Sequence, residues 1–118
     1  MRAHRRKFVL ASALATFAAA TGALAVTKPR VVKVVARRFA FTPATIKLAK
    51  GEPVVFELTT QDVFMGMNIP DFGVRSDIVP GKTMRLALTP DKAGTFTFLC
   101  DVFCGDGHEG MSGTLVVT

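Results

Sequence analysis

The sequence contains no tryptophan and no tyrosine, so its ten phenylalanines must supply every aromatic side chain of a core. Cysteine and histidine, the residues that bind metals through sulfur and nitrogen, are also rare, with two of each in 118 residues. Beyond the N-terminal segment, no long stretch has apolar residues that recur every 3.6 residues. This argues against a helical domain. No repeat, linker or low-complexity segment divides the chain, whose length suits one small domain with a single core.

The N-terminal 25 residues predict an export signal. Four basic side chains lie within residues 1–7, residues 8–25 are apolar or small, and Ala23-Leu24-Ala25 matches the small-residue pattern of a cleavage site. The pair Arg5-Arg6 also resembles a twin-arginine signal, which suits a protein exported already folded. An uncleaved membrane anchor is the alternative, since the stretch approaches the ~17–25 residues that span a bilayer, but its Ala and Thr content makes a poor anchor.

Cleavage after Ala25 would leave a domain of residues 26–118 in the periplasm or another extracytoplasmic compartment. Four of the fifteen basic residues lie in the predicted signal, so eleven remain against nine acidic ones. The sequence pI of about 9.9 is therefore mainly a feature of the export signal and does not indicate a nucleic-acid partner. We expect a monomer that contacts a membrane only if the signal stays uncleaved.

Both cysteines, the only histidine beyond the predicted signal and one methionine lie between positions 100 and 111. Thiolates and thioethers are soft donors that favour Cu(I), and imidazole suits both copper and zinc. The Cys-x3-Cys spacing lets Cys100 and Cys104 converge from one tight loop, and His108 and Met111 follow at short intervals. Three glycines in the loop supply the backbone freedom that such a loop needs. The loop therefore predicts a metal site, with copper as the first choice.

The pattern C-x3-C-G-x-G-H-x-x-M, followed by a strand-like run, resembles the ligand loop of the binuclear copper-A domain. That domain is the cupredoxin module of cytochrome oxidase subunit II and of nitrous oxide reductase, in which two bridging thiolates join two coppers. The resemblance implies that Cys100 and Cys104 bridge the metals. It also implies that His108 and the backbone carbonyl of Val102 bind one copper and that Met111 binds the other.

One ligand position departs from that family. Residues 62–74 follow the family frame D-V-x-H-[SG]-F-x-[IV]-P-x-[FH]-G-V, but Met65 stands where the family has its second histidine. His4 lies in the predicted signal and cannot replace it, while Met67 is expected to pack in the core. Two thiolates with Met65 and Met111 form a softer donor set, which favours Cu(I) and a higher reduction potential. The sequence therefore allows a site with one copper ion as well as a site with two.

A disulfide between Cys100 and Cys104 is the main alternative to a copper site in an exported protein. So small a ring stabilises little by chain entropy, which weakens this alternative. Zinc suits two cysteines and a histidine, whereas Met111 argues against it. A thiol oxidoreductase would be expected to have the C-x-x-C spacing, which is absent. Copper therefore remains the preferred prediction for the loop.

Short runs of β-branched and aromatic residues, separated by Gly and Pro, predict β-strands. The expected strands are residues 31–41, 44–49, 54–59, 72–79, 83–88, 95–99 and 112–118, with residues 60–70 outside the sheet. The phrase F-x-F-T-P-x-x-I-x-L-x-K-G-x-P-V, which starts at Phe39, is similar to the opening of many cupredoxins. We therefore expect an all-β, cupredoxin-like Greek-key β-sandwich after the N-terminal signal peptide.

The residues around the loop have simpler expected roles. Asp101 is expected to stay solvated, and hydrogen bonds that support the metal ligands are the alternative role for it. Asp62 is expected to cap the turn that presents Met65. Four phenylalanines are expected to limit the access of water to the site: Phe64, Phe72, Phe98 and Phe103.

The leading hypothesis is an exported cupredoxin that acts as a one-electron carrier, with a copper-A-like loop of two cysteines, a histidine and a methionine. Such a protein needs a redox partner and has no catalysis of its own. The alternative is a periplasmic Cu(I) chaperone or copper-handling protein that binds through Cys100, Cys104, Met65 and Met111. That protein would pass the metal to a copper-accepting partner, and the two hypotheses differ in whether Cu(II) is held stably.

Overall fold

The computed structural model describes residues 28–118, and the following statements concern that part of the chain. The strands are β1 (Arg30–Arg37), β2 (Ala40–Thr42), β3 (Thr45–Leu48), β4 (Val54–Thr60), β5 (Met65–Ile69), β6 (Val74–Ile78), β7 (Met84–Leu88), β8 (Gly94–Leu99) and β9 (Ser112–Val117). Two short 3-10 helices, η3 (Pro70–Phe72) and η4 (His108–Gly110), interrupt them. Within the described residues, no helix has the length and apolar character needed to cross a membrane.

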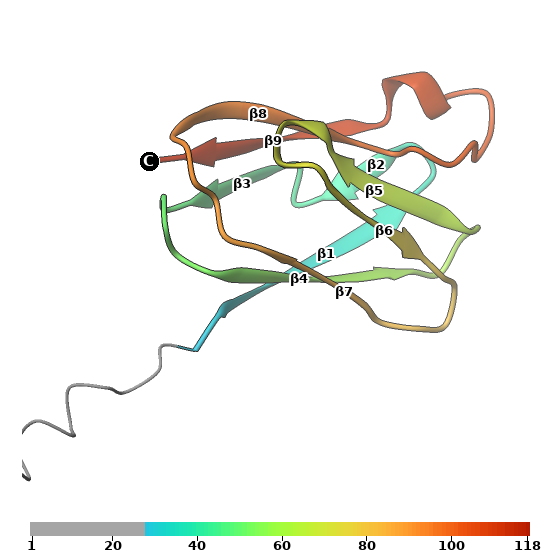
Figure 1. Ribbon diagram of the computed structural model, residues 1–118. Coiled ribbons are helices and arrows are strands. Elements are labelled where there is room, and N and C mark those ends of the chain that lie inside the picture. The colour runs from blue at the N-terminus through green and yellow to red at the C-terminus, as the bar shows by residue number, and fades with distance from the viewer. Residues whose placement is uncertain (1–27) are drawn as a thin grey trace, which may run out of the picture.

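Two sheets pack face to face (Figure 1). One has the strand order β2-β1-β4-β7 and the other the order β3-β9-β8-β5-β6. The chain passes repeatedly from one sheet to the other, so that β1 pairs with β4 and β3 with β9 in parallel, while the remaining pairs are antiparallel. The predicted all-β sandwich is confirmed.

The alternation of side chains along the strands builds the core between the sheets. In β1, Val32, Val34 and Ala36 are buried while the residues between them are exposed, and β4 alternates between buried and half-buried residues. Phe41 and Phe98 come from opposite sheets and meet edge to face with ring centroids 5.1 Å apart. Burying each large apolar side chain contributes roughly 1.5–3 kcal/mol, so this shared interior is what holds the two sheets together.

The run predicted as one strand over residues 31–41 is two strands. β1 ends at Arg37, the chain reverses through Arg38 and Phe39, and β2 returns antiparallel to β1. The backbone φ of Phe39 is 132°, a value that bulky L-residues rarely adopt. The composition of the run gives no turn signal, so strand propensity alone does not predict this reversal.

The expectation that residues 60–70 leave the sheet is wrong for Met65–Ile69, which forms β5. This strand lies between β8 and β6 in the second sheet. Its sequence, Met-Gly-Met-Asn-Ile, has a single β-branched residue, so intrinsic strand propensity is low. Met65, Met67 and Ile69 are nevertheless fully buried, which indicates that tertiary packing overrides local preference here.

Candidate metal centre

Strands β8 and β9 present the loop that contains the predicted ligands. They pair antiparallel from Gly94↔Val117 to Leu99↔Ser112. One further hydrogen bond, in which the Cys100 N–H donates to the Met111 carbonyl at 3.1 Å, closes the base of the loop. Cys100 and Met111 are thus fixed beside each other at one end of the sandwich, where the loop projects from the sheets (Figure 1).

Tight turns fold the rest of the loop back over this base. The His108 N–H donates to the Gly105 carbonyl at 3.1 Å, and the Met111 N–H donates to the His108 carbonyl at 3.1 Å. Gly105 has a φ of 139°, a conformation that side chains with a Cβ rarely adopt. These turns return His108 toward Cys104 instead of letting the loop extend into solvent.

The structure brings four of the predicted side chains together. The Cys104 Sγ lies 4.0 Å from the Cys100 Sγ, 3.7 Å from the His108 Nδ1 and 3.9 Å from the Met111 Sδ. The ligand atoms of the two cysteines and the histidine all lie within 4.8 Å of one another. Two donors that bind one tetrahedral ion with bonds of about 2.2 Å are about 3.6 Å apart, so the cluster needs only small adjustments to hold a metal.

The backbone carbonyl of Val102 also faces this cluster. Its oxygen lies 3.2 Å from the Cys100 Sγ, which donates to it as a thiol. Both cysteines are free thiols in the structure. A carbonyl oxygen is thus already directed at a sulfur of the predicted metal site.

The site is largely shielded from water. Cys100, Cys104 and Met111 are buried and His108 is half-buried. Burial raises the pKa of the Cys104 thiol above its ordinary value, and the adjacent Cys100 acts in the same direction. In the metal-free protein, Cys104 therefore loses its proton less readily than an exposed cysteine.

Met65 is fully buried and belongs to the same core cluster as the two cysteines and Met111. The register between β5 and β8, Asn68↔Leu99, brings Met65 opposite Val102 when it is continued into the loop. Met67 is equally buried and lies two residues further along the same strand. The first position of β5 therefore lies beside the loop, which is what a ligand role for Met65 requires.

Phe39 covers the ligand loop, a role that the sequence did not reveal. A Cβ added to Gly107 would lie 2.7 Å from the Phe39 Cγ, and one added to Gly105 would lie 3.1 Å from its Cζ. Asp62 supports this turn from the β4–β5 connection, because its carboxylate accepts the Arg38 N–H at 2.9 Å and pairs with the Arg38 side chain. Asp62 thus holds the β1–β2 turn rather than a turn before Met65.

The expected shield of four phenylalanines is only partly present. Phe98 is fully buried, and Phe103 lies 5.7 Å from the His108 ring, centroid to centroid, yet is 73% exposed. Phe64 is also exposed. Phe72 packs on Phe96 instead, with centroids 4.9 Å apart. Of the four, only Phe98 is fully buried, and Phe39, which was not among them, covers the loop.

Asp101 is not a free solvated residue as expected. Its carboxylate accepts two hydrogen bonds from Arg75 of β6. Arg75 and Asp101 are 26 residues apart, and no local sequence signal links them. The contact follows from the placement of β5, which the sequence did not predict as a strand.

A groove of about 520 Å³ lies over the ends of β1 and β4, and neither cysteine lines it. It is lined by Val35, Ala36, Arg37, Thr59, Thr60, Gln61 and Asp62. None of the predicted ligands lines it, and it has no cluster of soft donors. We therefore assign the chemistry to the buried loop cluster rather than to this open groove.

The fold and the cluster together define a β-sandwich metalloprotein with a sulfur-rich site in one loop. The family model described as "Cupredoxin-like domain" matches residues 8–117, and the chain belongs to this family. Two cysteine sulfurs, an imidazole nitrogen and a thioether sulfur are the donor types that copper accepts. The residues present therefore fit copper.

The chain is similar to cytochrome c oxidase subunit 2 of Thermus thermophilus, with 31% identity over 86 residues that make up 73% of this chain. The match spans 64% of that relative and 51% of a second subunit 2 from the same species. Among solved structures, the periplasmic domain of cytochrome oxidase subunit II of Bradyrhizobium japonicum has a TM-score of 0.71 at 19% identity, covering 80% of this chain and 88% of that one. A mixed disulfide intermediate between a thioredoxin-like protein and subunit II has a TM-score of 0.65 at 18% identity, with 80% and 86% covered. The two structures support the fold.

Proposed function

We propose that this protein holds copper in the β8–β9 loop and acts as a one-electron carrier in an extracytoplasmic compartment. The observation that supports this most directly is the convergence of the Cys100, Cys104 and His108 ligand atoms to within 4.8 Å of one another. Similarity to subunit 2 of cytochrome c oxidase supports the same role. When bound, copper supplies a one-electron redox couple between Cu(I) and Cu(II).

In this proposal, the side chains around the site hold a nearly fixed geometry in both oxidation states. Cys100 and Met111 are joined by a backbone hydrogen bond at the base of the loop, and Cys104 is buried against them. Val102 offers its carbonyl and Met65 its thioether as the further ligands. A donor set fixed by two paired strands changes little between states, which keeps the cost of reorganisation low.

His108 and Phe103 would form the contact with a redox partner. Both residues reach the surface at the end of the sandwich, and their rings lie 5.7 Å apart. His108 contacts the Cys104 sulfur on its inner side, so the ring connects the buried cluster with the exterior.

The cysteines must stay reduced before copper binds, and a thiol reductant would serve this step. A thioredoxin-like protein forms a mixed disulfide with subunit II in one structural relative. By analogy, a thiolate of such a reductant would attack a disulfide between Cys100 and Cys104, form a mixed disulfide with one cysteine and release the other. Resolution by its second thiolate would release both cysteines as thiols and leave the reductant oxidised.

The test is an anaerobic copper titration of the reduced protein, followed by metal analysis and by visible and EPR spectra after mild oxidation. Two coppers per chain with a delocalised mixed-valence spectrum would establish a binuclear electron carrier. One stable copper with a coloured oxidised form would establish a mononuclear carrier. One tightly held Cu(I) without a coloured oxidised form would contradict the carrier role and favour Cu(I) handling through the thiols, Met65 and Met111.

A further inference from the structure

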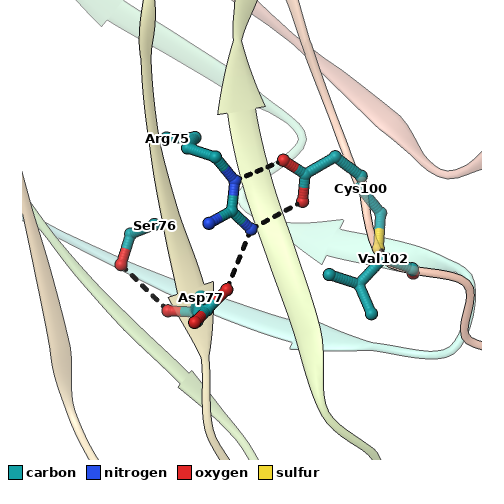
Figure 2. Close-up of polar contacts among 6 residues, drawn as sticks. Arg75, Ser76, Asp77, Cys100 and Val102 are labelled. Atoms are coloured by element: carbon teal, nitrogen blue, oxygen red, sulfur yellow. Dashed lines mark hydrogen bonds and ion pairs between the residues drawn. The ribbon is translucent and has the colours of Figure 1, made fainter.

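Arg75 reaches across a whole strand to the metal loop. It starts on β6, which pairs with β5, and its guanidinium lies over β5 (Figure 2). There it donates to the carboxylate of Asp101. The Nε–Oδ2 distance is 2.5 Å and the Nη2–Oδ1 distance is 3.0 Å. The Nη2 also donates to Asp77 at 2.9 Å. The contact to Asp101 is the paired, two-point geometry that arginine makes and lysine cannot.

Gly66 makes this crossing sterically feasible. A Cβ at this position in β5 would clash with the Asp101 Oδ1, would lie 2.6 Å from the Arg75 Nη2 and 3.2 Å from the Val102 Cγ2. The missing side chain therefore lets the ion pair and the side chain of Val102 lie directly on the strand. β6, β5 and the loop are held together at one point, although they come from different parts of the chain.

Asp101 lies between two predicted donors in the sequence. Cys100 precedes it and supplies a sulfur, while Val102 follows it and directs its carbonyl oxygen to that sulfur at 3.2 Å. An anchor on the side chain of Asp101 therefore restricts the backbone on both sides of it. The pKa of Arg75 is raised, chiefly by its hydrogen bonds to Asp101 and then to Asp77, so its charge is permanent.

We infer that Arg75 is a positioning residue of the metal site: through Asp101 it holds the Cys100–Val102 segment on β5, so that the Val102 carbonyl faces the donor cluster. This inference rests on the proposed copper-binding function. Arg75 itself touches none of the donor atoms in this arrangement. Surface ion pairs contribute little to stability, and the effect of Arg75 therefore falls on the loop geometry more than on the fold.

The test compares Arg75→Met and Arg75→Lys with the matched control Arg85→Met. Arg85 also forms an ion pair between strands, with one carboxylate oxygen of Glu57 at 3.2 Å, in the other sheet and outside the loop. For each variant, three quantities are measured: Cu(I) affinity by competition with a chromophoric chelator, hydrogen exchange of the loop amides without copper, and the urea midpoint of unfolding. Arg75→Lys keeps the charge and removes the two-point contact, so it separates charge from geometry.

We expect Arg75→Met to weaken Cu(I) binding about tenfold, as for other groups that orient metal ligands, and to speed amide exchange between residues 100 and 104. Arg75→Lys should recover less than half of this loss on a logarithmic scale, and Arg85→Met should change neither quantity. Asp101→Asn preserves the size of the side chain and should also speed amide exchange between residues 100 and 104. This variant provides the test if Arg75→Met does not fold.

Unchanged copper affinity and unchanged loop exchange in Arg75→Met would overturn the inference. So would an equal loss in Arg85→Met, or full recovery in Arg75→Lys, because either result would make charge rather than position the cause. Failure of the wild-type protein to bind copper would overturn the proposed function instead. The exchange measurement on the copper-free protein would still decide whether Arg75 holds the loop.

Discussion

The buried thiol of Cys104 makes the stability of the metal-free protein depend on pH. Its pKa is raised, first by burial and then by Cys100, whereas an unfolded cysteine titrates near ~8.5. The stabilising contribution is complete below about pH 8.5 and is lost as the pH rises through the higher folded value, because only the unfolded chain ionises in that window. The chain has no tyrosine to titrate in the same range.

We therefore expect the free energy of unfolding of the reduced, metal-free protein to fall above about pH 8.5. Urea titrations from pH 7 to pH 10 under a strong reductant would measure it. The variant Cys104→Ser should lose much of this pH dependence, since serine does not ionise there. An identical decline in the wild type and in Cys104→Ser would show that the raised pKa of Cys104 has no measurable effect on stability.

Met65 and Met67 allow a matched test of one proposed ligand. Both are fully buried on the same face of β5, so leucine at either position preserves apolar volume and should cost less than about 1.5 kcal/mol. We expect Met65→Leu to weaken Cu(I) binding, because leucine has no sulfur, and Met67→Leu to leave it unchanged. Chelator competition measures both affinities. Equal affinities of the two variants would show that Met65 is not a ligand.

At the scale of the strands, the sequence predicts those whose own residues favour β structure. β3, β4, β8 and β9 are found close to their expected positions because they are rich in β-branched or aromatic residues. β7 is found because its large apolar residues alternate, and β6 lies within the expected run 72–79. β5 is not predicted, because its own residues have low strand propensity and it forms only between its neighbours β8 and β6. The donors of the loop could be predicted because they are close together in the sequence and differ chemically from everything around them.

The supports of the loop could not be predicted in the same way. Arg75, Gly66 and Phe39 act on the loop only through the packing of distant strands. Arginine, glycine and phenylalanine are also common, and none has a spacing that signals its contact. The register of β5 against β8, Asn68↔Leu99, creates the Arg75 contact, and this register is a property of the folded sheet.

β9 offers a test of how tightly the strands below the loop are packed. A Cβ on Gly113 would clash with the ring of Phe98 and would lie 2.7 Å from the carbonyl oxygen of Ala44. Gly110 has no neighbouring atom within 4 Å of such a Cβ. We expect Gly113→Ala to destabilise the protein by about 1–3 kcal/mol and Gly110→Ala to stay within about 0.5 kcal/mol of the wild type.

Chemical denaturation of the two metal-free variants measures this difference. Because Phe98 lies two residues before Cys100, displacement of its ring should also disturb the base of the loop, and Gly113→Ala should bind copper more weakly. If the two alanine variants had equal stability, the close packing of Phe98 on β9 would be contradicted.

For the whole molecule, the important feature is that the donors come from one short loop while their supports come from both sheets. The sheet of β1 contributes Phe39, and the sheet of β5 contributes Met65 and, through β6, Arg75. Unfolding of either sheet therefore releases the loop. A metal bound at this site should be linked to the stability of the complete sandwich and not to the loop alone.

This linkage predicts how much copper stabilises the protein. Free Cu(I) at 100 times its dissociation constant should add about 2.7 kcal/mol to the free energy of unfolding if the unfolded chain does not bind it. Anaerobic urea titrations at several buffered Cu(I) concentrations measure the increase. The double variant Cys100→Ser, Cys104→Ser should show none, since hydroxyl groups replace both thiols. If copper binds the wild type with high affinity but leaves the unfolding midpoint unchanged, the unfolded loop must hold the metal equally well. That result would mean that the sandwich does not shape the site, and it would contradict a carrier whose ligands are fixed by the fold.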